Sequence, residues 1–275
     1  MITLLAATDF SKEAMNASHY AAETCSKIGA RLVLFTRHVN SVHVVNARLS
    51  AEAFQEVLDQ SKAKLKVNAE ELAAKYDISV IPVWTTGFLH EELQKAVQEN
   101  YVNLVVMGMA DKSFDQDLLG NSTTAAISKL DIPILAVPGK AKYQPIRRIL
   151  FSCDAHKGLF DTDFRILRMV AKALGAETQV FYVKRSAHPE SNRDKLKKML
   201  EEKFFDIDYQ VDVKESDAPV LRELKSKIER EKPDLLMMVP YKYGFLNSII
   251  HKSKTRAMAS GSKIPLLTVP YKENK

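Results

Sequence analysis

The chain contains an internal repeat, and the length of its interval limits the folds that are open to it. The segment Ile132–Pro138 reads Ile-Pro-Ile-Leu-Ala-Val-Pro, and Ile264–Pro270 reads Ile-Pro-Leu-Leu-Thr-Val-Pro, 132 residues further on. An apolar run that ends in aspartate, Leu4–Asp9, returns in the same way as Ile149–Asp154. Solenoid repeats are about 20 to 50 residues long, so this interval indicates a duplicated domain.

The chain length agrees with two domains. A chain of 275 residues fits two units of common domain size, each able to bury a core of its own. The polar segment Gly139–Pro145 follows the first copy of the repeated strand, and its glycine and proline are typical of a short connection. The sequence therefore predicts domains at residues 1–140 and 145–275 that pack together.

Strand-like and helix-like segments alternate through both halves. Apolar runs in the first half predict strands at Ile2–Ala7, Leu32–Thr36, Ile78–Val83, Val102–Met107 and Ile132–Val137, with helices at Phe10–Lys27, Ala51–Lys75, His90–Glu99 and Thr123–Leu130. The second half repeats the series and ends with a helix near Ser253–Ala259 and a strand at Pro265–Val269. Apolar runs without alternation are typical of strands covered on both faces. We therefore predict an α/β fold of two tandem, doubly wound, five-stranded parallel-sheet domains.

The positive charge is concentrated in the second half. Residues 1–140 carry 13 Lys and Arg against 16 Asp and Glu, and residues 141–275 carry 27 against 18. Such an excess can mark a surface for polyanions. The basic residues alternate with acidic ones in segments such as Arg193–Lys203, however, and they lack the aromatic interleaving of nucleic-acid stacking surfaces. We therefore do not expect nucleic-acid binding.

The cysteines and the apolar runs indicate a cytoplasmic protein. Cys25 and Cys153 lie one in each half, inside apolar patterns, which favours buried thiols in a reducing compartment. The sequence shows neither a charged leader with an apolar stretch nor a run of about 18 apolar residues. We expect a soluble protein of the cytoplasm with no membrane partner.

The chain lacks the residue patterns of common catalytic sites. Its seven histidines are scattered, and His38 and His43 are the closest pair; two ligands without a third nearby seldom hold a metal. Neither a Gly-x-x-x-x-Gly-Lys-Ser/Thr loop nor a Gly-x-Ser-x-Gly elbow occurs. We expect no catalytic residues and no metal site, and therefore no enzyme.

A strand, a glycine-containing connection and a helix start follow one another near the end of the first half. The strand ends at Val106-Met107-Gly108, and Gly120-Asn121-Ser122-Thr123 precedes the next predicted helix. Glycine after the strand lets the backbone turn without a Cβ, and amides and hydroxyls at a helix start hold phosphate oxygens. Met107, Gly108, Gly120, Asn121, Ser122 and Thr123 are therefore candidate nucleotide-binding residues.

These features resemble the universal stress protein family in its tandem two-domain form, and the resemblance extends over nearly the whole chain. Nucleotide-binding members have Gly-x-x-Gly, nine residues and then Gly-Ser/Thr after a strand that ends in Val-Met-Gly. Here Gly108 and Gly120 reproduce the two ends, whereas Asp111 stands at the second glycine. Only eight residues separate Asp111 from Gly120, and Asn121 displaces the hydroxyl. Asp111 places a negative charge where phosphates would lie, unless Mg²⁺ bridges the two.

The resemblance implies further ligand contacts. Asp9 matches the acidic residue that faces the ribose and base, with Ala7 and Thr8 beside it, and Arg37 matches a position whose backbone contacts adenine. Asp9 could equally cap the following helix, and the two roles are compatible. The implied fold is Rossmann-like, of the adenine nucleotide alpha hydrolase kind. The implied ligand is ATP or a related adenine nucleotide with Mg²⁺.

The second half keeps Asp154 but loses the glycine-containing connection. Val239-Pro240-Tyr241-Lys242 stands in place of Gly108-Met109-Ala110-Asp111. Proline and tyrosine do not allow the close backbone approach that glycine does, so we expect no nucleotide there. The basic segment His251–Arg256 is either an anion or partner site or a solvated surface.

Two functions stay open from the sequence. The first is a non-catalytic stress-response protein, with slow ATP hydrolysis at most, whose first half senses a nucleotide and whose second half mediates association. The alternative is a nucleotide-free interaction module whose last strands, ending at Pro138 and Pro270, serve self-association. The two halves would then imitate a dimer of single domains within one chain, or two chains would form a homodimer.

Overall fold

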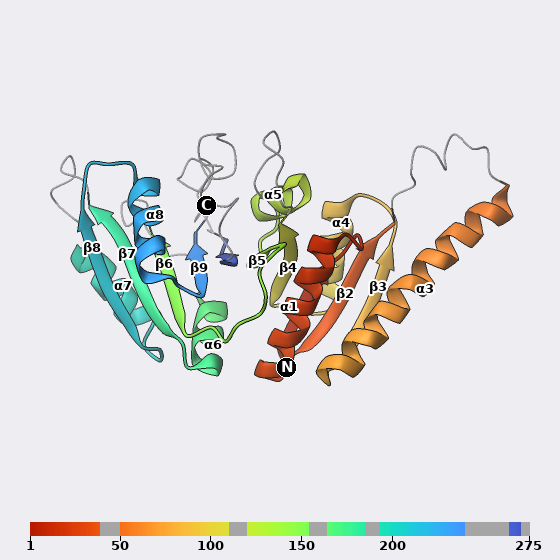
Figure 1. Ribbon diagram of the computed structural model, residues 1–275, viewed down its shortest axis with the longest axis horizontal. Helices are drawn as coiled ribbons and strands as arrows, with labels where there is room; N and C mark the ends of the chain where they lie inside the picture. Colours follow the sequence, from red (N-terminus) through yellow and green to blue (C-terminus); the bar gives the residue numbers. More distant parts are fainter. Residues whose placement is uncertain (39–49, 110–119, 154–163, 185–192, 240–263, 271–275) are drawn as a thin grey trace.

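The computed structural model describes residues 1–38, 50–109, 120–153, 164–184, 193–239 and 264–270 (Figure 1). The elements of the first half are β1 (Thr3–Ala7), α1 (Lys12–Ile28), β2 (Arg31–Arg37), α3 (Ala51–Tyr76), β3 (Val80–Thr85), α4 (Leu89–Glu99), β4 (Leu104–Met109), α5 (Gly120–Lys129) and β5 (Ile134–Pro138). Those of the second half are β6 (Arg148–Cys153), α6 (Arg165–Leu174), β7 (Glu177–Lys184), α7 (Arg193–Lys203), β8 (Tyr209–Glu215), α8 (Val220–Glu231), β9 (Leu235–Met238) and β10 (Leu266–Thr268).

All ten strands belong to one sheet, in the order β3-β2-β1-β4-β5-β10-β9-β6-β7-β8. Within each half the neighbouring strands are parallel. The predicted α/β fold with five parallel strands in each half is thus confirmed. The division into domains at residues 1–140 and 145–275 stays a prediction.

The two halves of the sheet meet at the antiparallel pair β5–β10. Leu266 lies opposite Ala136, and Thr268 lies opposite Ile134. The hydroxyl of Thr268 also donates to the carbonyl oxygen of Ile134 at 3.2 Å. Each half thereby covers the edge strand that the other would leave unpaired.

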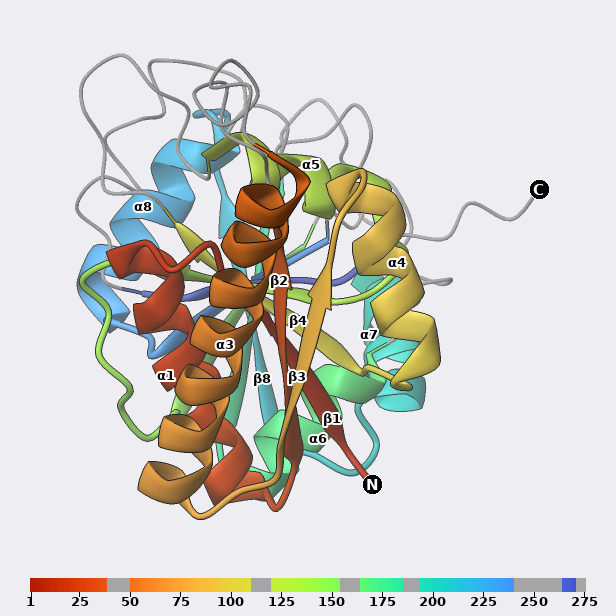
Figure 2. The same cartoon turned by 90° about the vertical axis from the view of Figure 1, so that its right-hand side faces the viewer.

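Helices cover both faces of the sheet, with α1 and α3 on one side of the first half and α4 and α5 on the other (Figure 2). Small buried residues line the inner side of α1, and they are Ala14, Ala17, Ala21 and Ala22. The helix begins at the N-cap Ser11, as the sequence predicts, and ends at Gly29 in the left-handed conformation. Small side chains let the helix backbone lie close to the strands, which matters at the candidate site.

Corresponding residues of the two halves form the same hydrogen bonds. The side-chain oxygen of Asn103 accepts the amide hydrogen of Thr3, and the carboxylate of Asp234 accepts that of Arg148, both at 2.9 Å. In a second repeated pair the hydroxyl of Thr85 donates to Glu92, and that of Ser216 donates to Glu223. Both halves therefore keep the same hydrogen bonds between corresponding residues.

The start of one predicted helix differs from the structure, and another predicted helix cannot be compared with it. Helix α5 begins at Gly120, three residues before the predicted start at Thr123, so the prediction was wrong there. The helix predicted at residues 253–259 lies outside the described residues. In the part of the chain that the structure describes, no helix has the length and apolar character needed to cross a bilayer.

Candidate functional site

The carboxyl ends of three adjacent strands form one rim in the first half. Ala7 at the end of β1 is paired with Phe35 of β2 on one side and with Met107 of β4 on the other. Strands β1, β2 and β4 are thus neighbours, and the order of strands reverses between β1 and β4. Parallel α/β sheets bind ligands outside the strand ends at such a reversal.

The turn after β1 is fixed by its own side chains. The hydroxyl of Thr8 accepts the amide hydrogen of Phe10, and the Asp9 carboxylate accepts that of Ser11, both at 2.9 Å. Phe10 has a φ of 63°, a left-handed conformation that is uncommon for a bulky residue. Asp9 is exposed, and Ser11 rather than Asp9 is the N-cap of α1. The Asp9 side chain therefore supports the helix start while facing solvent at the rim.

Thr36 lies on the rim near the end of β2, where the sequence predicts it, but its hydrogen bond could not be read from the sequence. It is buried, and its hydroxyl donates to the carbonyl oxygen of Thr8 at 2.7 Å. The amide of Thr8 in turn donates to the carbonyl oxygen of Phe35. These bonds keep β1 and β2 together beyond the last paired residues. A threonine in an apolar strand gives no sequence signal of this role.

The structure explains the glycine at position 108 by packing against a helix and not by a turn. It lies within β4, paired with Val137, rather than in a turn. A Cβ at this position would lie 2.6 Å from the carbonyl oxygen of Glu13 and 2.9 Å from the amide nitrogen of Ala14. The glycine is therefore required by the backbone of α1, which crosses β4 at this point.

The first turn of α5 adjoins the same strand. Thr123 is buried, and its hydroxyl donates to the carbonyl oxygen of Gly108 at 3.0 Å, whereas Ser122 is exposed. Gly120 and Asn121 belong to this turn as well. The connection at residues 110–119, including Asp111, lies outside the described residues.

Arg37 and Met107 complete the set of predicted site residues. The guanidinium of Arg37 at the end of β2 donates to the carbonyl oxygen of Gly87 at 3.1 Å. Met107 is buried in β4 beneath the rim. The structure thus brings the predicted residues of β1, β2, β4 and α5 to one edge of the sheet. Their contact with a ligand stays a prediction.

Other candidate chemistry is not assembled in the described residues. They contain no group of three or more His, Cys, Asp or Glu side chains placed to hold a metal ion. Cys25 is buried, and burial raises the pKa of its thiol to about 12, which keeps it protonated and unreactive. His43, Asp154 and the basic segment His251–Arg256 lie outside the described residues.

Comparison with known families decides the relationship. A model of the universal stress protein family matches residues 1–138. The chain belongs to the universal stress protein family. The resemblance found in the sequence is thus confirmed. No curated protein sequence matches the chain.

Solved universal stress protein structures share the fold over both halves. One from Archaeoglobus fulgidus DSM 4304 has a TM-score of 0.69 at 16% identity, with 97% of each chain covered. A Pseudomonas aeruginosa UCBPP-PA14 protein assigned to the same family has a TM-score of 0.59 at 13% identity, covering 98% of this chain and 93% of its own. A universal stress protein in complex with cAMP covers 50% of this chain and 96% of its own at 16% identity, with a TM-score of 0.37.

Proposed function

We propose that this universal stress protein is a non-catalytic nucleotide-binding protein of the cytoplasmic stress response, and that its first half holds the nucleotide. The observation that carries the proposal is the meeting of the ends of β1, β2 and β4 with the first turn of α5 at the reversal of strand order. Such reversals are ligand sites in parallel sheets, and first-turn amides favour phosphate groups. ATP or a related adenine nucleotide with Mg²⁺ is the ligand that the family resemblance implies.

The candidate residues divide into two roles in this proposal. Thr8, Thr123 and Gly108 shape the rim, because their polar groups or their lack of a Cβ are used within the protein. Asp9 and Ser122 are exposed. One oxygen of the Asp9 carboxylate accepts from Ser11, and the other would meet the ribose or base, whereas Ser122 would meet phosphate or a phosphate-bound Mg²⁺. Ala7, Arg37, Met107, Gly120 and Asn121 complete the proposed binding set.

Calorimetric titration of ATP into the full chain, with and without Mg²⁺, tests the proposal. We expect saturable binding that is lost in Gly120→Val, because a branched side chain would stand where the ligand approaches the helix start. Ala74→Val is the matched control, since Ala74 is exposed on α3 away from this turn. No heat with the native chain, or equal binding by Gly120→Val, would contradict the proposal. Phosphate release from the same samples measures any slow hydrolysis.

The association of the two halves supports a second proposed property. The antiparallel pair β5–β10 joins edge strands that would otherwise be free to recruit another chain. We propose that the two halves act as a pseudo-dimer and that the chain needs no homodimer through these strands. Sedimentation velocity should then show a monomer at high concentration. A dimer that dissociates when β3 or β8 is altered would instead show that the outer edges of the sheet associate.

A further inference from the structure

The guanidinium of Arg37 is oriented at the rim with most of its donors unused. One of its nitrogens donates to the carbonyl oxygen of Gly87 at 3.1 Å. Within the described parts of the chain, that oxygen is the one hydrogen-bond partner of the Arg37 side chain. An arginine carries five N–H donors in a planar fork, so a fixed fork remains available to a ligand.

An exposed aromatic ring belongs to the loop that Arg37 contacts. Phe88 follows Gly87 directly, and 75% of its surface is exposed. The loop that carries it is held at both ends, because Arg37 bonds Gly87 and the hydroxyl of Thr85 bonds the carboxylate of Glu92. Gly87 has a φ of 110°, which only glycine adopts readily. The loop is therefore braced with its phenyl ring directed to solvent.

Asp9 faces solvent on the neighbouring strand. Ala7 and Phe35 are paired in register, and Asp9 and Arg37 each follow two residues later. The bond from Thr36 to Thr8 keeps the two chains adjacent at this level. Asp9 and Arg37 make no ion pair with each other. The rim thus offers a fork of donors on one strand end and a carboxylate acceptor on the next.

We infer that the first half prefers a guanine base over an adenine base, an inference that rests on the proposed nucleotide-binding function. Guanine presents the O6 and N7 acceptors, which an arginine fork binds with two hydrogen bonds. Its adjacent N1–H and N2–H donors match the carboxylate of Asp9. Adenine keeps the N7 acceptor but presents an amino donor at the place of O6 and an acceptor at N1, so Arg37 would lose one of its two hydrogen bonds and Asp9 would lose the adjacent pair of donors. Phe88 supplies a stacking face for either base.

The second half has other residues at the positions of Arg37, Gly87 and Phe88. Phe181 pairs with Ser152 as Phe35 pairs with Ala7, and Val183, two residues further along β7, is buried. Ahead of α8, Ala218 and Pro219 stand in place of Gly87 and Phe88. The arginine and the phenyl ring are thus confined to the half that keeps the glycine-containing connection, whereas Asp9 has a counterpart in Asp154.

The fluorescence of Trp84 provides the measurement. The chain has a single tryptophan, and it lies opposite Thr36 near the end of β3. GDP, ADP and inorganic pyrophosphate are titrated into the full chain with Mg²⁺, and pyrophosphate binding is confirmed by calorimetry. We expect GDP to bind about tenfold more tightly than ADP, the size of one bidentate contact.

Three variants test whether Arg37 binds the base or the phosphates. Arg37→Met should bring GDP to the affinity of ADP and leave ADP and pyrophosphate within about twofold of the native values. Arg37→Lys should not restore the preference, because lysine keeps the charge but not the fork. Arg222→Met removes an exposed arginine of the second half and should change nothing.

The outcomes distinguish this inference from the proposed function. Equal affinities of GDP and ADP for the native chain overturn the base preference and leave nucleotide binding intact. A loss of pyrophosphate and both nucleotides in Arg37→Met, restored by Arg37→Lys, assigns Arg37 to the phosphates and also overturns it. If neither nucleotide binds the native chain while its far-ultraviolet circular dichroism is that of a folded protein, the proposed function fails first and the preference with it.

Discussion

The two halves place different chemistry at the same point between the third strand and the helix that follows it. Leu93 of α4 and Leu224 of α8 are both buried, and three residues further on stand Ala96 and Lys227. On the strand, Phe35 pairs with Val83, whereas its counterpart Phe181 pairs with Asp212. The first half therefore buries the methyl group of an alanine where the second half buries the ammonium group of a lysine.

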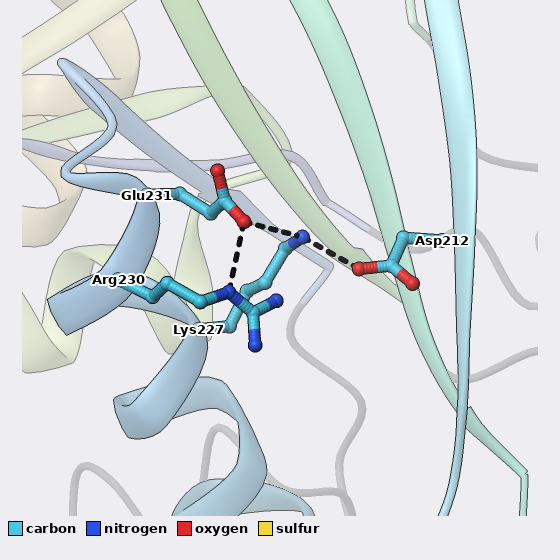
Figure 3. A network of polar contacts seen from close by, with 4 residues as sticks. All are labelled: Asp212, Lys227, Arg230 and Glu231. Carbon is cyan, nitrogen blue, oxygen red and sulfur yellow. Dashed lines mark hydrogen bonds and ion pairs between the residues drawn. The ribbon is translucent and has the colours of Figure 1, made fainter.

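The lysine is buried, and two acidic side chains reach its amino group from partly exposed positions (Figure 3). Its amino group lies 2.5 Å from a carboxylate oxygen of Asp212 and 3.3 Å from one of Glu231, which also accepts from Arg230 at 3.0 Å. The Lys227 side chain is 3% exposed, whereas those of Asp212 and Glu231 are 37% and 36% exposed. Because an unpaired buried charge is strongly destabilising, lysine is tolerated here only where both acids accompany it.

Introducing the lysine alone into the first half is the strongest test of this difference. Ala96→Lys would bury an ammonium beside Val83, without a carboxylate in the position of Asp212. We expect the free energy of unfolding to fall by about 3 to 5 kcal/mol, the cost of an uncompensated buried charge. Urea unfolding followed by circular dichroism measures it. Gln94→Lys, at an exposed position of the same helix, should have little effect; equal losses would show that helix α4 is sensitive to any lysine.

The space between the first helix and the sheet also differs. Ala6 and Gly108 lie beneath α1, and the matching residues of the second half are Phe151 and Val239, both buried. The first half thus lets its helix backbone approach, whereas the second half fills the space with side chains. Gly108→Ala should lower the free energy of unfolding by about 1 to 3 kcal/mol, since its Cβ would overpack against the backbone of α1.

A substitution at the matching position of the second half tests the same difference in packing. Val239→Ala removes buried atoms from the second half and should destabilise it by leaving a cavity, although the same residue type is introduced. Thermal unfolding of both variants measures the effect. If Gly108→Ala were as stable as the native chain, α1 would not be held against β4 as the structure shows.

The repeat and the order of strands and helices could be read from the sequence because apolar runs and breaks are local signals. The roles of Thr36, Gly108 and Lys227 could not, because each depends on contact with a segment distant in the chain. Gly108 was assigned to a ligand turn by its motif, and it is instead explained by a helix that lies above it. Lys227 stands among alternating charges that predict only a solvated helix face. Local patterns report elements and their order, whereas close approach and charge burial arise from packing.

Replacing the ion pair with apolar residues should convert the second half to the chemistry of the first at little cost. In Lys227→Met with Asp212→Val, the desolvation of the ammonium is removed together with its attraction to the carboxylate. We expect the free energy of unfolding to equal the native value or exceed it by up to about 1 kcal/mol. Asp212→Val alone is the control, and it should be the less stable protein because Glu231 is then the remaining partner of Lys227. A double variant less stable than that control would contradict this account.

The smallest expected effect is a pH dependence at the turn that joins α7 to β8. The side chain of Arg168 donates to Asp206 at 2.5 Å, and this hydrogen bond lowers the pKa of the carboxyl below its ordinary value of 3.8. The ionised form is favoured in the folded chain, so this contribution to stability is complete above the ordinary pKa. It is lost as the pH falls through the lower folded value.

Asp206→Asn should therefore cost stability near neutral pH and cost progressively less in acid, so that its urea midpoint approaches the native one below the ordinary carboxyl range of about 4. Asp208→Asn alters an exposed aspartate two residues away and should give a difference that does not converge in this way. Midpoints measured at about pH 7 and about pH 3 decide between them. A constant gap between Asp206→Asn and the native chain would mean that the turn is held by the shape of the side chain rather than by its charge.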